Sequence, residues 1–157
     1  MSDLVAVQDA GDRLSEAELV ATVVLLLNAG HEASVNGFGN GLVSWLAAGS
    51  PGAAVEPLVE EMLRHDAPLQ LFERTVLRPC TVAGVDLEPG ERVAALLGAA
   101  NRDPARFPGP AVFDPARSVP HLSFGAGIHF CVGAPLARLE LQVAAGALLR
   151  RWPRLEL

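Results

Sequence analysis

The chain has 157 residues, 50% of them hydrophobic, which is enough for one domain with a buried core. Its 12 basic and 18 acidic residues give a formal net charge of -6, so it lacks the basic field that attracts nucleic acid. It has two cysteines and no basic-then-apolar signal pattern at its start, so we expect a cytoplasmic protein without a disulfide framework.

The first predicted element is a long helix from near Glu16 to about Ala47. Ser15 is followed three residues later by Glu18, which is the pattern of a helix capping box. The apolar pattern then continues without a proline. Its longest apolar run, residues 19–27, falls well short of the roughly 20 residues that span a bilayer. We therefore expect a mostly buried helix and no membrane partner.

A second, shorter helix is predicted around residues 57–65, with Pro68 closing it. On this helix Glu61 and Arg64 are three residues apart and therefore share one face. From residue 69 to residue 97, short β-type runs alternate with turn sequences, which predicts a small antiparallel sheet. The expected fold class is thus mainly α-helical with a small antiparallel β-sheet.

Residues 101–121 are rich in Pro, Asp, Arg and Phe, which predicts an ordered but irregular coil. A last helix is expected from about Ala134 to Arg151, with Pro135 in its first turn. Its apolar pattern predicts four inward-facing side chains: Leu136, Leu139, Val143 and Leu148.

The stretch FGAGIHFCVG, residues 124–133, joins the coil to the last helix. Its glycines permit tight turns and the close approach of a flat group to the backbone. Cys131 stands just before the helix, where the helix dipole favours a thiolate that can bind iron. The residue types alone are also compatible with a glycine turn around an inert cysteine. A zinc site from His121, His129 and Cys131 lacks paired-ligand spacing, and the glycines at 37–41 follow a helix rather than a dinucleotide-binding strand.

The segment FGAGIHFCVGAPLARLE, residues 124–140, resembles the haem-binding loop and following helix of cytochromes P450. The match places a phenylalanine, glycines, a basic residue and a cysteine in register. The resemblance implies that Cys131 is the metal ligand, bound to the iron of haem b. It also implies that Phe124, Gly125, His129 and Gly133 contact this cofactor.

Other segments resemble the family in the same order. Glu61 and Arg64 match the family's Glu-x-x-Arg motif, and Arg117 matches an arginine of the coil that joins this pair. The resemblance implies a buried structural network in which loss of one member leaves the others uncompensated. Arg74 falls where bacterial members place a haem-propionate ligand, and His129 matches a second such contact.

The segment AGHEAS, residues 29–34, is similar to the family's central helix, where an acid followed by a threonine organises proton delivery to bound oxygen. Glu32, Ala33 and Ser34 are the candidate catalytic residues by this resemblance, but Ala33 replaces the threonine. One step along a helix rotates a side chain by about 100°, so Ser34 replaces it only if the helix widens locally. We therefore expect altered oxygen activation, with protons supplied by a substrate hydroxyl or an ordered water.

The resemblance implies a bacterial-type monooxygenase that oxidises a small lipophilic substrate with O2. Electrons would come from NAD(P)H through a ferredoxin or similar redox partner. We expect residues 1–157 to form a single partial domain without the family's N-terminal part and C-terminal hairpin. The alternative is a truncated, inactive remnant that binds haem or a partner at most. The expected substrate-facing residues are Ala29, Gly30, Leu69 and Phe72.

Overall fold

The computed structural model describes residues 14–157, and its first element is the 32-residue helix α2, Glu16–Ala47. The predicted capping box is present at its start. The Ser15 hydroxyl accepts a hydrogen bond from the Glu18 amide at 3.3 Å, and the Glu18 carboxylate accepts one from the Ser15 amide at 2.8 Å. These two bonds satisfy amides that the helix itself leaves unpaired, which is why the helix begins here.

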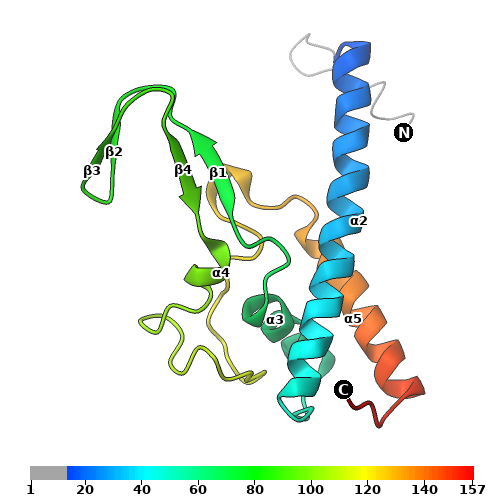
Figure 1. Ribbon diagram of the computed structural model, residues 1–157. Helices are drawn as coiled ribbons and strands as arrows, with labels where there is room; N and C mark the ends of the chain where they lie inside the picture. The colour runs from blue at the N-terminus through cyan, green and yellow to red at the C-terminus, as the bar shows by residue number, and fades with distance from the viewer. Residues whose placement is uncertain (1–13) are drawn as a thin grey trace.

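The expectation that α2 is mostly buried is wrong for the residues that the structure describes. Its buried residues, Gly37, Gly41 and Trp45, all lie in its C-terminal half, while Val24 and Leu27 are 51% and 69% exposed. In Figure 1 the N-terminal half of α2 stands apart from the other elements. By length and composition α2 could cross a membrane, a property shared with many core helices of water-soluble proteins.

The helix α3, Val55–His65, packs against both α2 and the last helix, α5, Ala134–Arg151, and all three helices lie together in Figure 1. Both helices lie where the sequence predicts them. α2 approaches α3 closely at Gly41, where an added Cβ would overlap the Cβ of Met62. Gly37 and Gly41 therefore serve packing, whereas Gly39 faces open space. Two buried clusters form the core: Trp45, Leu58, Met62 and Phe113, and Val59, Leu63, Leu141 and Ala145.

The predicted inward face of α5 is wrong at three of its four positions, and the fourth, Leu148, is partly buried. Leu136, Leu139 and Val143 are 61%, 56% and 61% exposed. The helix instead buries a face of mostly small residues, because α3 approaches closely on that side and large side chains would keep the two helices apart. The residues buried on α5 are Ala134, Leu141, Ala145 and Gly146.

The β region consists of two separate two-stranded antiparallel ladders rather than one sheet. The strand β1, Phe72–Thr75, pairs with β4, Arg92–Ala95, so that Phe72 lies opposite Ala95. Between them β2, Cys80–Val82, and β3, Val85–Leu87, form a hairpin whose turn has positive φ at Ala83 and Gly84. This hairpin projects away from the helices in Figure 1.

After β4 the chain forms one helical turn, α4, Leu97–Ala100, and then the predicted irregular coil. Residues 101–121 contain no helix or strand, yet Asn101, Phe107 and Phe113 are buried within them. The coil is therefore ordered by tertiary contacts rather than by its own hydrogen-bond ladder. A short 3-10 helix, η1, Gly127–His129, then leads into Cys131 and α5.

Candidate functional site

Cys131 lies in a tight loop between η1 and α5 and is partly buried. The loop reverses direction at Gly125 and Gly127, whose φ values of 71° and 69° disfavour residues with a Cβ. The Cys131 amide donates a hydrogen bond to the carbonyl of Phe124 at 2.9 Å, and the Phe130 amide donates one to Gly127 at 3.0 Å. These bonds fix the backbone that carries the sulfur.

The thiol of Cys131 is placed at the N-terminal end of an 18-residue helix. Gly133 is the N-cap of α5, and a Cβ added to it would lie 3.8 Å from Cys131 Sγ, so the sulfur lies directly beside the cap. The backbone amides that the helix leaves unpaired and the positive end of its dipole lie at this end of α5. A thiolate in this position is a competent ligand for a soft metal centre.

The surroundings of Cys131 fit a haem better than a bare metal ion. Ile128 and Val132 flank the cysteine and are 98% and 90% exposed, so a large apolar surface adjoins the sulfur. Within residues 14–157 no group of three His, Cys, Asp or Glu side chains could hold a metal, which leaves the zinc alternative without support. A flat apolar porphyrin would cover these side chains, and its iron, held by Cys131, would supply oxygen activation.

The two residues expected to bind haem propionates, Arg74 and His129, are both exposed. Arg74 donates a hydrogen bond to the carbonyl of its neighbour Glu73 at 2.8 Å, and its guanidinium lies 5.8 Å from the centre of the Phe72 ring. Among the described residues no hydrogen bond or ion pair joins Arg74 to the Cys131 loop. Both side chains are therefore available to hydrogen-bond a carboxylate ligand, and their role stays a prediction.

The predicted network of Glu61 and Arg64 is present and almost completely buried, with both side chains 2% exposed. Arg64 Nε and Nη2 donate to the two Glu61 carboxylate oxygens at 2.6 and 2.7 Å, a planar bidentate pair. The other N–H groups of Arg64 donate hydrogen bonds to backbone carbonyls of the coil. Its carbonyl acceptors there are Asn101 at 2.9 Å, Pro110 at 3.1 Å and Val112 at 3.2 Å.

Arg117 joins this network as predicted. Its Nε lies 3.6 Å from Glu61 Oε1, while its Nη atoms donate to the carbonyls of Pro108 at 2.8 Å and Gly109 at 2.9 Å. The amide of Asp114 adds a hydrogen bond to Glu61 Oε1 at 2.7 Å. The single carboxylate of Glu61 thus anchors the coil to α3 through a set of charge-assisted bonds.

The candidate catalytic residues lie on an uninterrupted part of α2, so the local widening that would reorient Ser34 is not present. The Ser34 hydroxyl donates to Glu140 Oε2 on α5 at 3.2 Å, a partner that the sequence reading missed. Ala33 is partly buried and Glu32 is exposed. Of the substrate-facing candidates, Leu69 and Phe72 are 42% and 39% exposed, and Ala29 and Gly30 are exposed as well.

Sequence reasoning also missed how the start of the Cys131 loop is anchored. The side chain of Asn101 is fully buried, donates to Ser123 Oγ at 2.8 Å and accepts from the Leu122 amide at 2.7 Å. Ser123 in turn donates to the Leu63 carbonyl on α3 at 2.7 Å. No local spacing signals these contacts, because the partners are separated by 21 to 60 residues.

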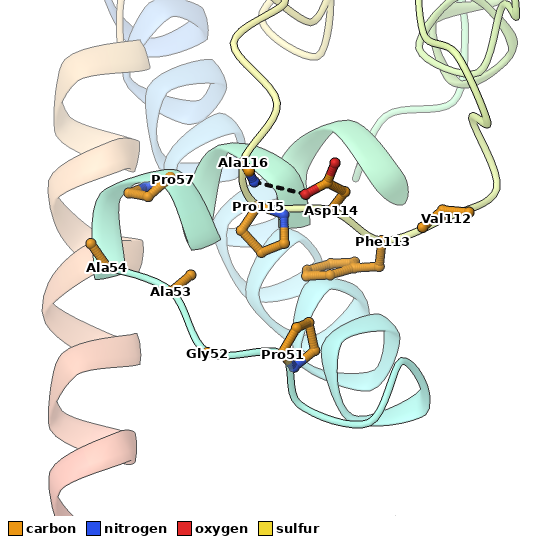
Figure 2. A pocket seen from close by; sticks show the side chains of 10 residues that line it. All are labelled: Pro51, Gly52, Ala53, Ala54, Pro57, Val112, Phe113, Asp114, Pro115 and Ala116. Atoms are coloured by element: carbon orange, nitrogen blue, oxygen red, sulfur yellow. Dashed lines mark hydrogen bonds between the residues drawn. The ribbon is translucent and has the colours of Figure 1, made fainter.

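Figure 2 shows an open cleft between the α2–α3 linker, Pro51 to Ala54, and the coil from Val112 to Ala116. Its only ionisable lining side chain is Asp114, whose carboxylate accepts a hydrogen bond from the Ala116 amide at 3.0 Å. The cleft contains no residue of the Cys131 loop. It lacks the groups that acid–base or nucleophilic chemistry needs, so it is not the candidate active site.

Comparison with known proteins agrees with this geometry. The family model described as Cytochrome P450 matches residues 55–154. Cytochrome P450 107B1 of Saccharopolyspora erythraea is 48% identical, with 98% of this chain and 40% of that protein covered. The biotin biosynthesis cytochrome P450 of Bacillus subtilis is 44% identical, with 93% and 39% covered. The chain thus spans about two fifths of the length of these relatives.

The structural neighbours lead to the same family. The crystal structure of CYP109E1 from Bacillus megaterium in complex with testosterone superimposes with a TM-score of 0.89 at 34% identity. The superposition covers 99% of this chain and 45% of that one. The matched family model extends over most of the chain and includes both the Glu61 network and the Cys131 loop. On sequence and on structure, therefore, this chain belongs to the cytochrome P450 family.

Proposed function

We propose that this chain forms the haem-thiolate part of a monooxygenase that oxidises a small lipophilic substrate with O2. The observation that carries the proposal is the position of Cys131 at the N-terminus of α5, flanked by the exposed apolar side chains of Ile128 and Val132. Electrons would come from NAD(P)H through a ferredoxin or a similar protein. The testosterone complex of a structural neighbour supports a lipophilic substrate. A cytoplasmic location is part of the proposal and is supported by the bacterial relatives.

In this proposal each of the site residues has a separate role in binding the haem or in holding the fold around it. Cys131 holds the iron of haem b, and the side chains of Arg74 and His129 donate hydrogen bonds to its propionates. Ile128 and Val132 cover the apolar ring beside the sulfur and exclude water from it. The Glu61 network holds the coil in place, as its buried bidentate geometry allows.

Proton delivery in this proposal departs from the family pattern at Ala33, which has no hydroxyl. Ser34 does not replace it, because its hydroxyl is bonded to Glu140 on α5. A substrate hydroxyl or an ordered water then supplies the protons. The substitution Ala33→Thr should change the amount of product formed per NAD(P)H consumed in the haem-loaded protein. An unchanged ratio would count against this part of the proposal.

The decisive experiment is haem reconstitution of the full chain, followed by absorption spectra of the reduced, carbon-monoxide-bound form. We expect a thiolate-type Soret band in the parent and in Cys80→Ser, the matched cysteine control. Cys131→Ser should lose that band, because an alcohol is a much weaker and harder ligand than a thiolate. An unaltered spectrum in Cys131→Ser would refute the assignment of the iron ligand.

The second candidate is a catalytically inactive chain that acts at most as a haem-binding or partner-binding module. The observation that favours it is the exposed apolar surface of α2, where Leu25 and Leu27 are 66% and 69% exposed. Exposed apolar side chains in such number favour association with another surface. Haem uptake without product formation in the reconstituted parent would favour this candidate over the monooxygenase.

A further inference from the structure

A second ionic cluster lies behind the Cys131 loop and is separate from the Glu61 network. Glu60 on α3 accepts two hydrogen bonds from Arg138 on α5, at 2.7 Å to Nε and 3.0 Å to Nη2. His121, which precedes the loop, places its Nε2 3.2 Å from Glu60 Oε2, the oxygen that also accepts from Arg138 Nη2. Three elements that are far apart in the sequence therefore converge on one carboxylate.

His121 is held in this cluster by its own loop. Its Nδ1 accepts a hydrogen bond from the Ser123 amide at 3.1 Å, so the ring proton of neutral His121 resides on Nε2. The side chain is 4% exposed, and Nε2 lies at ion-pair distance from Glu60 but outside hydrogen-bond geometry. Partial burial raises the pKa of Glu60, but its contacts with His121 and Arg138 outweigh burial and lower the pKa to about 2.

The cluster meets the Cys131 loop at Phe124. The Arg138 guanidinium lies 4.5 Å from the centre of the Phe124 ring, and the His121 ring lies 5.7 Å from it. This is the range of cation–π and tilted aromatic contacts. The carbonyl of the same Phe124 accepts the hydrogen bond from the Cys131 amide at 2.9 Å. One residue thus connects the charged cluster to the backbone of the expected iron ligand.

We propose that Glu60, His121 and Arg138 form a positioning cluster that holds the Cys131 loop in place through the ring and the carbonyl of Phe124. In metal sites, groups outside the ligand itself orient the ligand, and their loss typically costs about 10- to 100-fold in metal affinity or activity. For haem retention this inference rests on the proposed function. The positioning of the loop is a property of the chain itself and can be measured without haem.

The first test is hydrogen exchange, followed by mass spectrometry, on the full chain without haem. Glu60→Gln and Arg138→Gln should each speed exchange in peptides that contain the Cys131 amide, while peptides from α2 stay at the parent rate. Glu56→Gln on α3 and Arg150→Gln on α5 are the matched controls and should leave the loop peptides unchanged. Arg138→Lys, which keeps the charge but loses the planar group over Phe124, is the milder variant if Arg138→Gln does not fold.

The second test uses the haem-loaded chain. We expect Glu60→Gln and Arg138→Gln to release haem to apomyoglobin about 10- to 100-fold faster and to weaken the thiolate-type band of the carbon-monoxide complex. The double variant should be no worse than either single variant, because both act through one contact. Parent-like exchange in the loop, or equal effects in the two controls, would overturn the positioning role. Faster loop exchange in a chain whose parent binds no haem would refute the proposed function alone.

Discussion

Replacing Arg64 with methionine tests how the coil is fixed behind the Cys131 loop. Arg64→Met keeps a long side chain but removes every donor, so the Glu61 carboxylate stays buried with only the Asp114 amide and Arg117 near it. Three carbonyls of the coil lose the Arg64 bond, and two of them, Asn101 and Pro110, have no other side-chain donor among the described contacts. The substitution therefore leaves a buried charge and buried acceptors uncompensated.

The expected loss follows from these contacts. Breaking a buried ion pair by removing one partner costs about 3–5 kcal/mol. The carbonyls that lose their donor add to this cost, since a fully buried unpaired group costs about 1–3 kcal/mol. We therefore expect the destabilisation by Arg64→Met to lie at the upper end of the range for a broken buried ion pair. Typical domains have a free energy of unfolding of about 5–15 kcal/mol, so Arg64→Met should remove a large part of it. Arg64→Lys should recover only a fraction, because an ammonium cannot form the bidentate pair.

The assay is urea unfolding of the full chain followed by circular dichroism, with the free energy taken from the linear dependence on urea. Arg92→Met is the matched control, because Arg92 pairs with Glu73 at the surface, where the two side chains are 68% and 46% exposed. An exposed pair of this kind contributes at most about 1 kcal/mol. If Arg64→Met destabilises the chain no more than Arg92→Met does, the network is not what holds the coil.

Two further predictions concern packing and charge. Gly41→Ala should lower the free energy of unfolding by about 1–3 kcal/mol, because the added methyl group overpacks on Met62. Gly39→Ala should raise it by up to about 1 kcal/mol, because nothing lies within 4 Å of that position. Urea unfolding of the two variants checks both signs. The pKa of Glu60 falls from 4.5 to about 2 on folding, so its carboxylate stabilises the chain above about pH 4.5 and loses this effect as the pH falls toward 2. The stability difference between the parent and Glu60→Gln should therefore be largest near neutral pH and shrink over that acid range, and a difference independent of pH would contradict it.

Much of the local structure was predictable because its causes are local. The capping box at Ser15 and Glu18 marks the start of α2, and Pro135 marks the start of α5, since caps and helix-start prolines act within one turn. Gly125 and Gly127 of the Cys131 loop likewise adopt the positive φ that their residue type allows. The spacing of Glu61 and Arg64 on one face also follows from helix geometry alone.

The errors arose where burial depends on a neighbour that is distant in sequence. Apolar periodicity favoured Leu136 and Leu139 as the inward face of α5, but the close approach of α3 selects Ala145 and Gly146 instead. For α2 the apolar pattern predicted burial along its length, yet only its C-terminal half meets α3 and α5. Hydrophobicity shows that a side chain can be buried, and tertiary packing decides whether a partner is there.

The amino-acid sequence by itself determined the order of the elements, the identity of the expected iron ligand Cys131, and the family to which the chain belongs. Only the tertiary structure decided that Ser34 bonds to Glu140 and that Glu60, His121 and Arg138 converge behind the Cys131 loop. The physical reason is that backbone signals act over a few residues. Ion pairs and hydrogen bonds act over a few ångströms, and the partners in this cluster are brought within that range from 78 residues apart.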